Sequence, residues 1–305
     1  MQLKFTFRKA TELGIALIAI TTLVLAGCGG GGSSSNGGGV VTTSATVTPF
    51  KGPFSNGTVV IKDANGTPVS LVSGGTINAS GVAVISYNAS VAYPIIVEVT
   101  GSYYNEVTGT TETSTVPLRG IITSSSSISA NSGVPVTIVT ETAVADLQNR
   151  LGTFSSSTPI TAASAVAALS TAGTILGIPA STAPVFTSST HLTSDAGTLR
   201  LAALAVVANN QAGATLVDKA KALAVSLVQL GANAPTTIIS QATYDNALTS
   251  VTSGALNMMA AGATAPTSVV ISTTNYIAIN SSNTPTQVAM VWGQSNAFWD
   301  AVDWQ

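Results

Sequence analysis

The first half of the chain alternates apolar and polar residues in short runs, which is the pattern of β-strands. Asp63-Ala64-Asn65-Gly66 separates the first two runs, and asparagine and glycine tolerate positive φ, so the sequence predicts a β-hairpin there. The runs rich in apolar and β-branched residues span residues 58–61, 69–72, 81–88, 93–101, 116–123 and 133–140. Short strands separated by turn residues predict an antiparallel β-sandwich domain over residues 49–139.

After residue 140 the apolar residues recur with the spacing of α-helices. Gly152 and Gly177 can end helices, and Thr161 can begin one. The predicted helices span residues 140–152, 162–176, 194–210 and 215–231, and a fifth begins at residue 240. Small apolar residues on their faces allow close packing, so we predict an α-helical bundle over residues 140–264.

Strand-like runs return at the end of the chain, in residues 267–273, 275–280 and 286–292. They define a short C-terminal β-region over residues 265–305, whose strands pair either with the first β-domain or with one another. Its last residues contain all three tryptophans, and two interpretations are open for this tail: closure of the core of the last strands, or an exposed docking patch. The aromatic residues of the tail are Trp292, Phe298, Trp299 and Trp304. The predicted fold class is therefore α+β.

The first 27 residues have the layout of a secretory signal peptide. Three basic residues precede an apolar run of 14, residues 13–26, which is shorter than the ~20 residues of a membrane-spanning helix. Leu25-Ala26-Gly27-Cys28 follows, and this tetrapeptide resembles the lipobox of bacterial lipoproteins. The resemblance implies that Cys28 is lipidated and becomes the mature N-terminus once residues 1–27 are removed. The alternative is a membrane helix with an incidental cysteine, and the glycine-rich segment that follows argues against it.

Residues 28–48 comprise the lipidated cysteine and a flexible tether, because glycine and serine dominate the start of the segment. Bacterial lipoproteins carry more than one acyl chain, which is enough for stable anchoring. In these families an aspartate after the cysteine favours retention at the inner membrane, and this chain has Gly29 there. The resemblance therefore implies a protein anchored by lipid in the bacterial cell envelope, at the periplasmic or surface face of the outer membrane.

Charged residues make up only 7% of the chain, against about 25% in a typical soluble domain. The few lysines and arginines are isolated, so no basic cluster can neutralise a run of phosphates, which argues against nucleic-acid binding. Cys28 is the sole cysteine, so the mature fold has no internal disulfide and depends on the burial of apolar surface.

Within the β-region, three pieces occur in a recognisable order: Gly57-Thr58-Val59-Val60, Asp63-Ala64-Asn65-Gly66 and residues 76–81. This order resembles the carboxypeptidase regulatory-like or transthyretin-like modules of exported bacterial proteins, over roughly residues 50–125. The resemblance implies an Ig-like or transthyretin-like β-sandwich. Such modules are usually non-catalytic spacers or binding units.

Candidate chemistry is sparse. His191 is the only histidine, so a multi-histidine metal site is impossible, and Asp195 nearby is better explained, like Ser194, as a helix cap. Asp63-Ala64-Asn65-Gly66 imitates the start of a calcium loop, but the twelfth position would be Gly74 instead of a glutamate. We therefore predict no metal site and no cofactor.

A segment of fifteen residues contains three glutamates and a pair of tyrosines: Glu98, Glu106, Glu112 and Tyr103-Tyr104. Paired carboxylates are what glycoside hydrolysis requires, and exposed tyrosines suit sugar stacking. Carboxylates and tyrosines on a β-surface are also ordinary solvated or cross-strand residues, so a weak ligand-binding surface is a better prediction than catalysis.

These observations predict a non-catalytic envelope lipoprotein with a structural or protein-interaction role, which associates with copies of itself or with another envelope protein. A low-charge surface and edge strands without lysines favour such association. The alternative is a monomeric lipoprotein that binds a glycan or a small ligand, and a hydrolase ranks third. The predicted binding surface consists of Tyr103, Tyr104, Trp292, Phe298, Trp299 and Trp304.

Overall fold

The computed structural model describes residues 41–128, 133–188, 191–192, 195–228, 241–252, 274–275 and 290–291. The predicted lipidation site Cys28 and the aromatic tail, with Trp292, Phe298, Trp299 and Trp304, lie outside the described residues. Within the described ranges, the chain forms two mostly antiparallel sheets of four strands and five α-helices. The described strands and helices agree with the predicted α+β class.

The first sheet has the strand order β4-β5-β1-β8, with β1 at Thr42–Pro49, β4 at Leu71–Gly74, β5 at Ala83–Asn88 and β8 at Val134–Val136. β1 is antiparallel to β5 but parallel to β8, with Val47 beside Val134. The parallel pair departs from the wholly antiparallel prediction. The reason is that β8 is reached by a connection from the other sheet, and only strands joined by a tight hairpin must be antiparallel.

The second sheet has the order β3-β2-β6-β7, with β2 at Phe54–Lys62, β3 at Pro68–Val69, β6 at Ile95–Asn105 and β7 at Thr110–Ile122. The predicted hairpin joins β2 to β3. The Asp63 carboxylate accepts hydrogen bonds of 2.9 Å from the backbone N–H groups of Asn65 and Thr67, and Gly66 has a φ of 79°. The polar tetrapeptide therefore serves the turn.

Side chains from both sheets and from the helices belong to one large hydrophobic core. Alternate residues of β5 are buried in it, as the pleat of a β-strand requires, whereas the last five residues of β7 are all buried. Its fully buried members include Val47, Ile61, Ile85, Val97, Leu118, Leu147, Leu204 and Leu223. The β-region and the helices consequently share their main apolar core.

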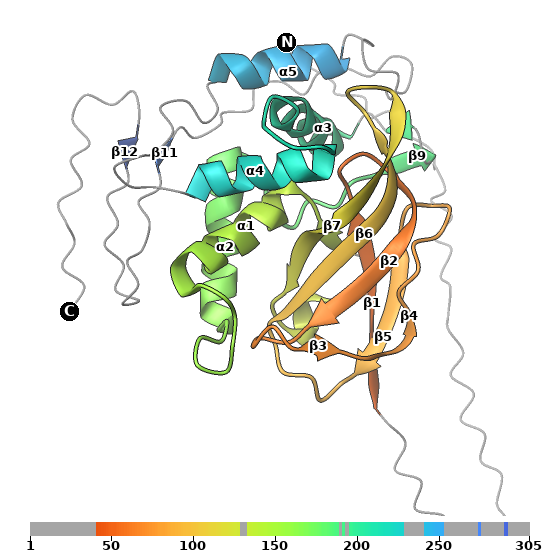
Figure 1. Cartoon of the computed structure of the whole chain (residues 1–305), viewed down its shortest axis with the longest axis vertical. Coiled ribbons are helices and arrows are strands. Elements are labelled where there is room, and N and C mark those ends of the chain that lie inside the picture. Colours follow the sequence, from red (N-terminus) through yellow and green to blue (C-terminus); the bar gives the residue numbers. More distant parts are fainter. Residues whose placement is uncertain are drawn as a thin grey trace, which may run out of the picture. The chain divides into compact units, whose positions relative to one another are not determined.

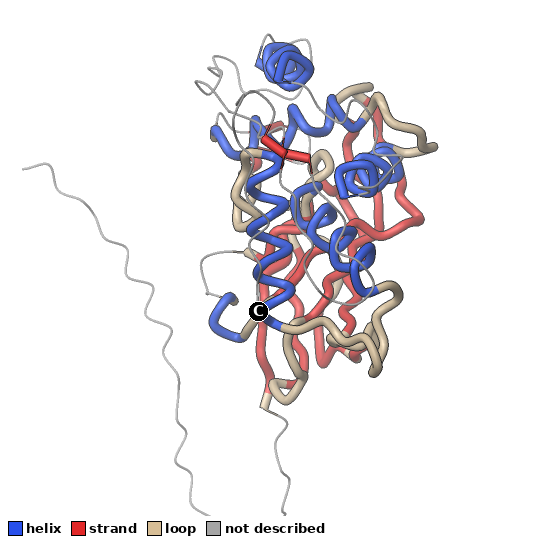
Figure 2. The backbone as a smooth tube through the Cα atoms, turned by 90° about the vertical axis from the view of Figure 1, so that its left-hand side faces the viewer, coloured by secondary structure: helices blue, strands red, loops and turns tan. Residues whose placement is uncertain are grey.

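The helices are α1 at Ile138–Leu151, α2 at Ala162–Leu176, α3 at Ala196–Ala208, α4 at Leu216–Val228 and α5 at Gln241–Thr252. α1 and α4 pack against β7, α2 packs against α1, and α3 packs against α5. The ribbon in Figure 1 and the tube in Figure 2 show the helices gathered on the β7 side of the strands. No described helix is both long and apolar enough to span a membrane.

The predicted helix caps are confirmed where the signal is local. The Thr161 hydroxyl accepts a hydrogen bond of 3.1 Å from the Ser164 N–H at the start of α2, and Gly177 ends that helix with a φ of 64°. Asp195 caps α3 by accepting from the Thr198 N–H at 2.9 Å, and Gly152 ends α1 with a φ of 73°.

The strand predicted over residues 133–140 is too long. β8 stops at Val136, and α1 begins at Ile138, because Thr137 and Thr140 form a capping box. The Thr140 hydroxyl accepts a 2.8 Å hydrogen bond from the Thr137 N–H, and the Thr137 hydroxyl faces the first backbone N–H groups of the helix. Near the C-terminus, β11 (Thr274–Asn275) pairs with β12 (Met290–Val291), so these two short strands pair with each other.

Candidate functional site

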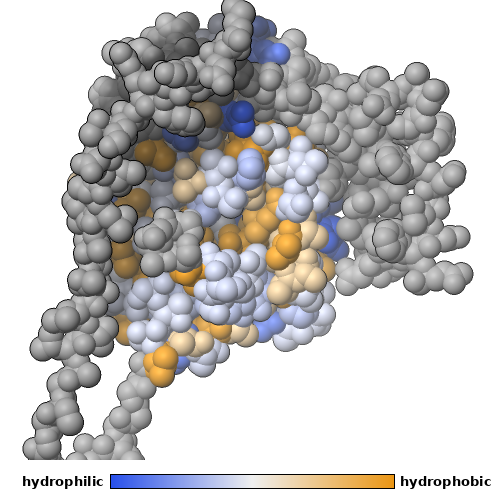
Figure 3. Space-filling view, turned by 180° about the vertical axis from the view of Figure 1, so that it is seen from behind, coloured by the Kyte–Doolittle hydropathy of each residue, from blue (hydrophilic) through white to orange (hydrophobic). Residues whose placement is uncertain are grey.

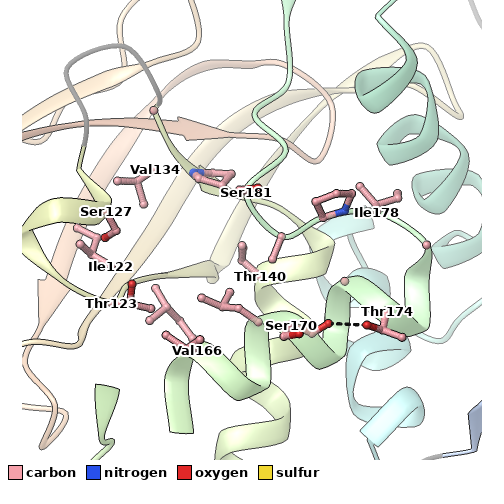
Figure 4. Close-up of a pocket in the computed structure, with 18 residues that line it drawn as sticks. Ile122, Thr123, Ser127, Val134, Thr140, Val166, Ser170, Thr174, Ile178 and Ser181 are labelled. Atoms are coloured by element: carbon pink, nitrogen blue, oxygen red, sulfur yellow. Dashed lines mark hydrogen bonds between the residues drawn. The ribbon is translucent and has the colours of Figure 1, made fainter. Parts of the chain in front are cut away.

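A pocket of about 680 Å³ lies where α2 faces the ends of β7 and β8. The picture of the site shows these residues arranged around one hollow (Figure 4). The apolar lining residues are Ile121, Ile122, Val134, Pro135, Val166, Leu169, Ile178, Pro179 and Ala180. The hydroxyl-bearing ones are Thr123, Ser127, Thr140, Ser170, Thr174 and Ser181, and three glycines, Gly133, Gly173 and Gly177, complete the lining.

One wall of the pocket is set by the end of α2. The backbone N–H groups of Gly177 and Ile178 both donate to the Gly173 carbonyl, and the left-handed Gly177 turns the chain back along the helix. A Cβ at position 173 would lie 3.1 Å from the Ile178 carbonyl oxygen, which is a crowded contact. Glycine at this position therefore lets the returning segment pack closely against α2.

Three of the six hydroxyls that line the pocket donate hydrogen bonds to the protein itself. The Thr140 hydroxyl donates to the Arg119 carbonyl at 2.8 Å, the Thr174 hydroxyl donates to the Ser170 carbonyl at 2.9 Å, and the Ser127 hydroxyl donates to the Ser124 carbonyl at 2.6 Å. None of the described lining residues is ionisable. The described lining therefore offers no general acid, general base or thiol.

A second feature is a pair of buried, oppositely charged residues, Lys51 and Glu106, each 1% exposed. Within the described part of the chain, neither the lysine Nζ nor the two glutamate oxygens have a hydrogen-bond partner. Gly52, with a φ of 84°, leaves room for the carboxylate, because a Cβ there would lie 2.5 Å from Glu106 Oε2. Burial raises the pKa of Glu106 to about 7 and lowers the pKa of Lys51 to about 8, and the attraction between them only partly opposes this.

Glu112 lies near this pair but is fully engaged. Its carboxylate accepts hydrogen bonds from the Tyr103 hydroxyl at 2.6 Å, from Asn105 Nδ2 at 2.7 Å and from the Leu216 N–H at 2.8 Å. Burial acts to raise the pKa of Glu112, but the hydrogen bonds outweigh it and the pKa is below its ordinary value. The carboxylate thus joins β6 and β7 to the first turn of α4.

The prediction that Tyr103 and Tyr104 lie together on a binding surface is wrong for Tyr103. This side chain is completely buried, its ring centroid lies 5.3 Å from that of Phe54, and its hydroxyl accepts a hydrogen bond from the Val217 N–H at 3.1 Å. Tyr104 is half-buried. Consecutive residues of a strand point to opposite faces, so two adjacent tyrosines of β6 cannot form one flat surface.

The three glutamates do not form one catalytic site. Glu98 forms a 2.8 Å ion pair with Lys62 across the second sheet, while Glu106 and Glu112 both lie near Lys51. His191 belongs to the short strand β10 (His191–Leu192), which pairs with β9 (Phe186–Ser188). Among the described residues, no group of three or more histidine, cysteine, aspartate or glutamate side chains is arranged to hold a metal.

Sequence reasoning missed both Lys51 and the pocket. The available signal was that Lys51 stands alone between two aromatic residues, Phe50 and Phe54, which are themselves buried. The pocket residues come from separate stretches of the chain and form no motif. No protein-family model, curated protein or solved structure matches this chain.

Proposed function

We propose that this chain is a lipid-anchored, non-catalytic binding protein of the bacterial cell envelope, which holds a small ligand in the pocket beside α2. In this proposal an Ig-like or transthyretin-like β-sandwich and a helical bundle together form the scaffold. The observation that carries it is the pocket, whose volume of about 680 Å³ lies within the ~300–1,000 Å³ typical of ligand sites and whose described lining has no ionisable group.

Anchoring rests on Leu25-Ala26-Gly27-Cys28 and on the glycine-rich tether after it. Mass spectrometry of the native protein should find an N-terminal, acylated Cys28, and Cys28→Ser should release the protein from the membrane fraction. An unmodified N-terminus, or unchanged membrane association of the variant, would overturn this part of the proposal. Ligand binding is tested separately, because it does not depend on the lipid.

Binding can be measured on the mature chain, residues 28–305 with Cys28→Ser, produced without its leader. We expect native mass spectrometry of this protein, after incubation with a cell-envelope extract and repurification, to find one small molecule per chain. Substitution of Leu169 by aspartate should remove that molecule, because it places a charge in the pocket wall. An equally occupied Leu169→Asp variant would show that the molecule binds elsewhere.

A second candidate function is self-association, and exposed apolar residues on the strands favour it. Val72 on β4 and Val84 on β5 are each 56% exposed, and Val60 on β2 is 45% exposed. The space-filling view from behind shows apolar residues intermixed with weakly polar ones and few strongly hydrophilic ones on the coloured part of the surface (Figure 3). Sedimentation of the mature chain should reveal concentration-dependent dimers, and Val72→Ser with Val84→Ser should abolish them.

A further inference from the structure

We propose that the pocket takes one uncharged, predominantly apolar molecule: a hydrocarbon chain or ring skeleton that carries at most a hydroxyl or carbonyl group. The proposal rests on the proposed function and specifies the ligand class of the same site. It follows from the charge, the hydrogen bonding and the exposed apolar surface of the described lining residues.

The charge of the pocket argues against ionised ligands. None of its described lining residues is lysine, arginine, histidine, aspartate or glutamate. A carboxylate, phosphate or ammonium group that entered would lose water without gaining a charged partner, and such burial is strongly unfavourable. A neutral molecule has no such desolvation cost.

The hydrogen bonding argues against sugars. The hydroxyls of Ser127, Thr140 and Thr174 already donate to backbone carbonyls. The hydroxyls of Thr123, Ser170 and Ser181 are left to meet a ligand, and the described lining has no aromatic ring for stacking. A glycan would bury several hydroxyls without partners, at about 1–3 kcal/mol each, whereas a molecule with one polar group can be satisfied.

Exposed apolar surface in the pocket favours a ligand of hydrocarbon character. Val166 lines the pocket and is 55% exposed, although it lies on α2 next to the buried Ala165. Leu169, one turn further along α2, lines the same wall. A bound apolar molecule would remove this surface from water, which contributes roughly 25 cal/mol per Å². The same surface gives a charged or sugar-like ligand no comparable stabilisation.

The test uses the mature chain with Cys28→Ser and the uncharged fluorescent probe N-phenyl-1-naphthylamine. The probe is displaced in separate titrations by dodecanol, dodecanoate, dodecylammonium and maltose. We expect dodecanol to displace it at a concentration about tenfold or more below that of either charged compound, and maltose to have no effect. Val166→Asp should weaken probe binding by about tenfold or more.

Val225→Asp is the matched control, because Val225 is 40% exposed on α4 and does not line the pocket. Circular dichroism and thermal melting establish that both variants fold. The ligand class would be overturned if a charged compound or maltose displaced the probe better than dodecanol did. If Val166→Asp but not Val225→Asp had then lost probe binding, the pocket would still be the binding site. Equal probe binding by both variants would overturn the site. Binding of none of these compounds by the folded protein, together with no molecule retained from the envelope extract, would overturn the proposed function as well.

Discussion

Two of the clusters of buried charge in the described part of the chain differ in how fully their members are paired. In the first, Glu141 of α1 accepts hydrogen bonds from the Arg119 backbone N–H at 2.9 Å and from the Arg119 guanidinium, and from Lys221 Nζ at 3.0 Å. Gln148 receives a further guanidinium N–H at 2.6 Å. In the second, Lys51 and Glu106 are buried without hydrogen-bond partners among the described residues.

The difference shows how a protein with so few charges can use them. A buried ion pair is stabilised when hydrogen bonds satisfy its lone pairs and protons, and each charged side chain of the Arg119 cluster takes part in two or more such bonds while the cluster joins β7 to α1 and α4. Unpartnered charges in the same low-dielectric interior tend toward their neutral forms, as the opposite pKa shifts of Lys51 and Glu106 indicate. The first cluster stabilises the packing of the sheet against the helices, whereas the second, here called the weak point, lowers the stability of the fold.

The largest effect is expected for Glu141→Leu, which leaves Arg119 and Lys221 without their shared carboxylate. The free energy of unfolding should fall by about 3–5 kcal/mol, because one partner of a buried ion cluster is removed while the other charges stay buried. Urea denaturation of the mature chain measures this. A loss below about 1 kcal/mol would contradict the stabilising role of the cluster.

The second prediction concerns pH. Burial raises the pKa of Glu106, so its contribution to stability is full below pH 4.5 and is lost as pH rises through about 7. Burial lowers the pKa of Lys51, so the chain regains stability as pH rises from about 8 to 10.5. Relative to the double variant Lys51→Met/Glu106→Gln, the wild-type chain should therefore be least stable between about pH 7 and 8, with a Tm lower by on the order of 5 °C.

Melting curves of both proteins between pH 4.5 and 10.5 measure this difference. Glu112, the other carboxylate near Lys51, is present in both proteins, so its own titration largely cancels in the comparison. A Tm difference that does not vary with pH would contradict the assignment of the weak point to Lys51 and Glu106.

A smaller loss, of about 2 kcal/mol, is expected for Lys221→Met. This change removes the hydrogen bonds from Lys221 Nζ to Glu141 and to the Pro117 carbonyl, but Arg119 still neutralises the glutamate. Denaturation curves of Lys221→Met, Glu141→Leu and the double variant complete a thermodynamic cycle. Additive losses in that cycle would show that the two side chains do not belong to one cluster.

The smallest effect, below about 1 kcal/mol, is expected for Lys62→Met, because its ion pair with Glu98 is partly open to solvent. The variant is also the surface reference for both buried clusters in the same denaturation series. A loss of stability as large as that of Lys221→Met would mean that burial does not explain why the buried clusters contribute more than this partly exposed ion pair.

Features that depend on a few neighbouring residues could be predicted from the sequence. Thr161, Gly177 and Asp195 were identified as helix boundaries because capping is decided within one turn of the helix. The start of α1 was placed too late, because the β-branched residues after Gly133 favour a strand and only the Thr137–Thr140 capping box reverses this preference.

Features that depend on distant residues could not be predicted. The burial of Tyr103 is set by the pairing of β6 with β2 and by the N-terminus of α4, which lies over a hundred positions along the chain. The pocket likewise requires β7, β8 and α2 to come together, and none of its residues carries a recognisable chemical signature by itself. Periodicity predicts which face of an element is buried, but not which element covers it.

The position of β1 determines how the protein responds to a mechanical load. β1 begins at Thr42, so it takes up the last residues of the segment 28–48 that the sequence predicted as tether, and it lies inside its sheet, with β5 on one side and β8 on the other. A pull on the proposed tether would therefore enter at Thr42 and load the pairing of Thr42–Val47 with β5 first, and the pairing of Val47–Pro49 with β8 after it. Rupture under force is governed by the unfolding rate, so the strength of the β1–β5 pairing would set how well the fold resists drag on the proposed tether.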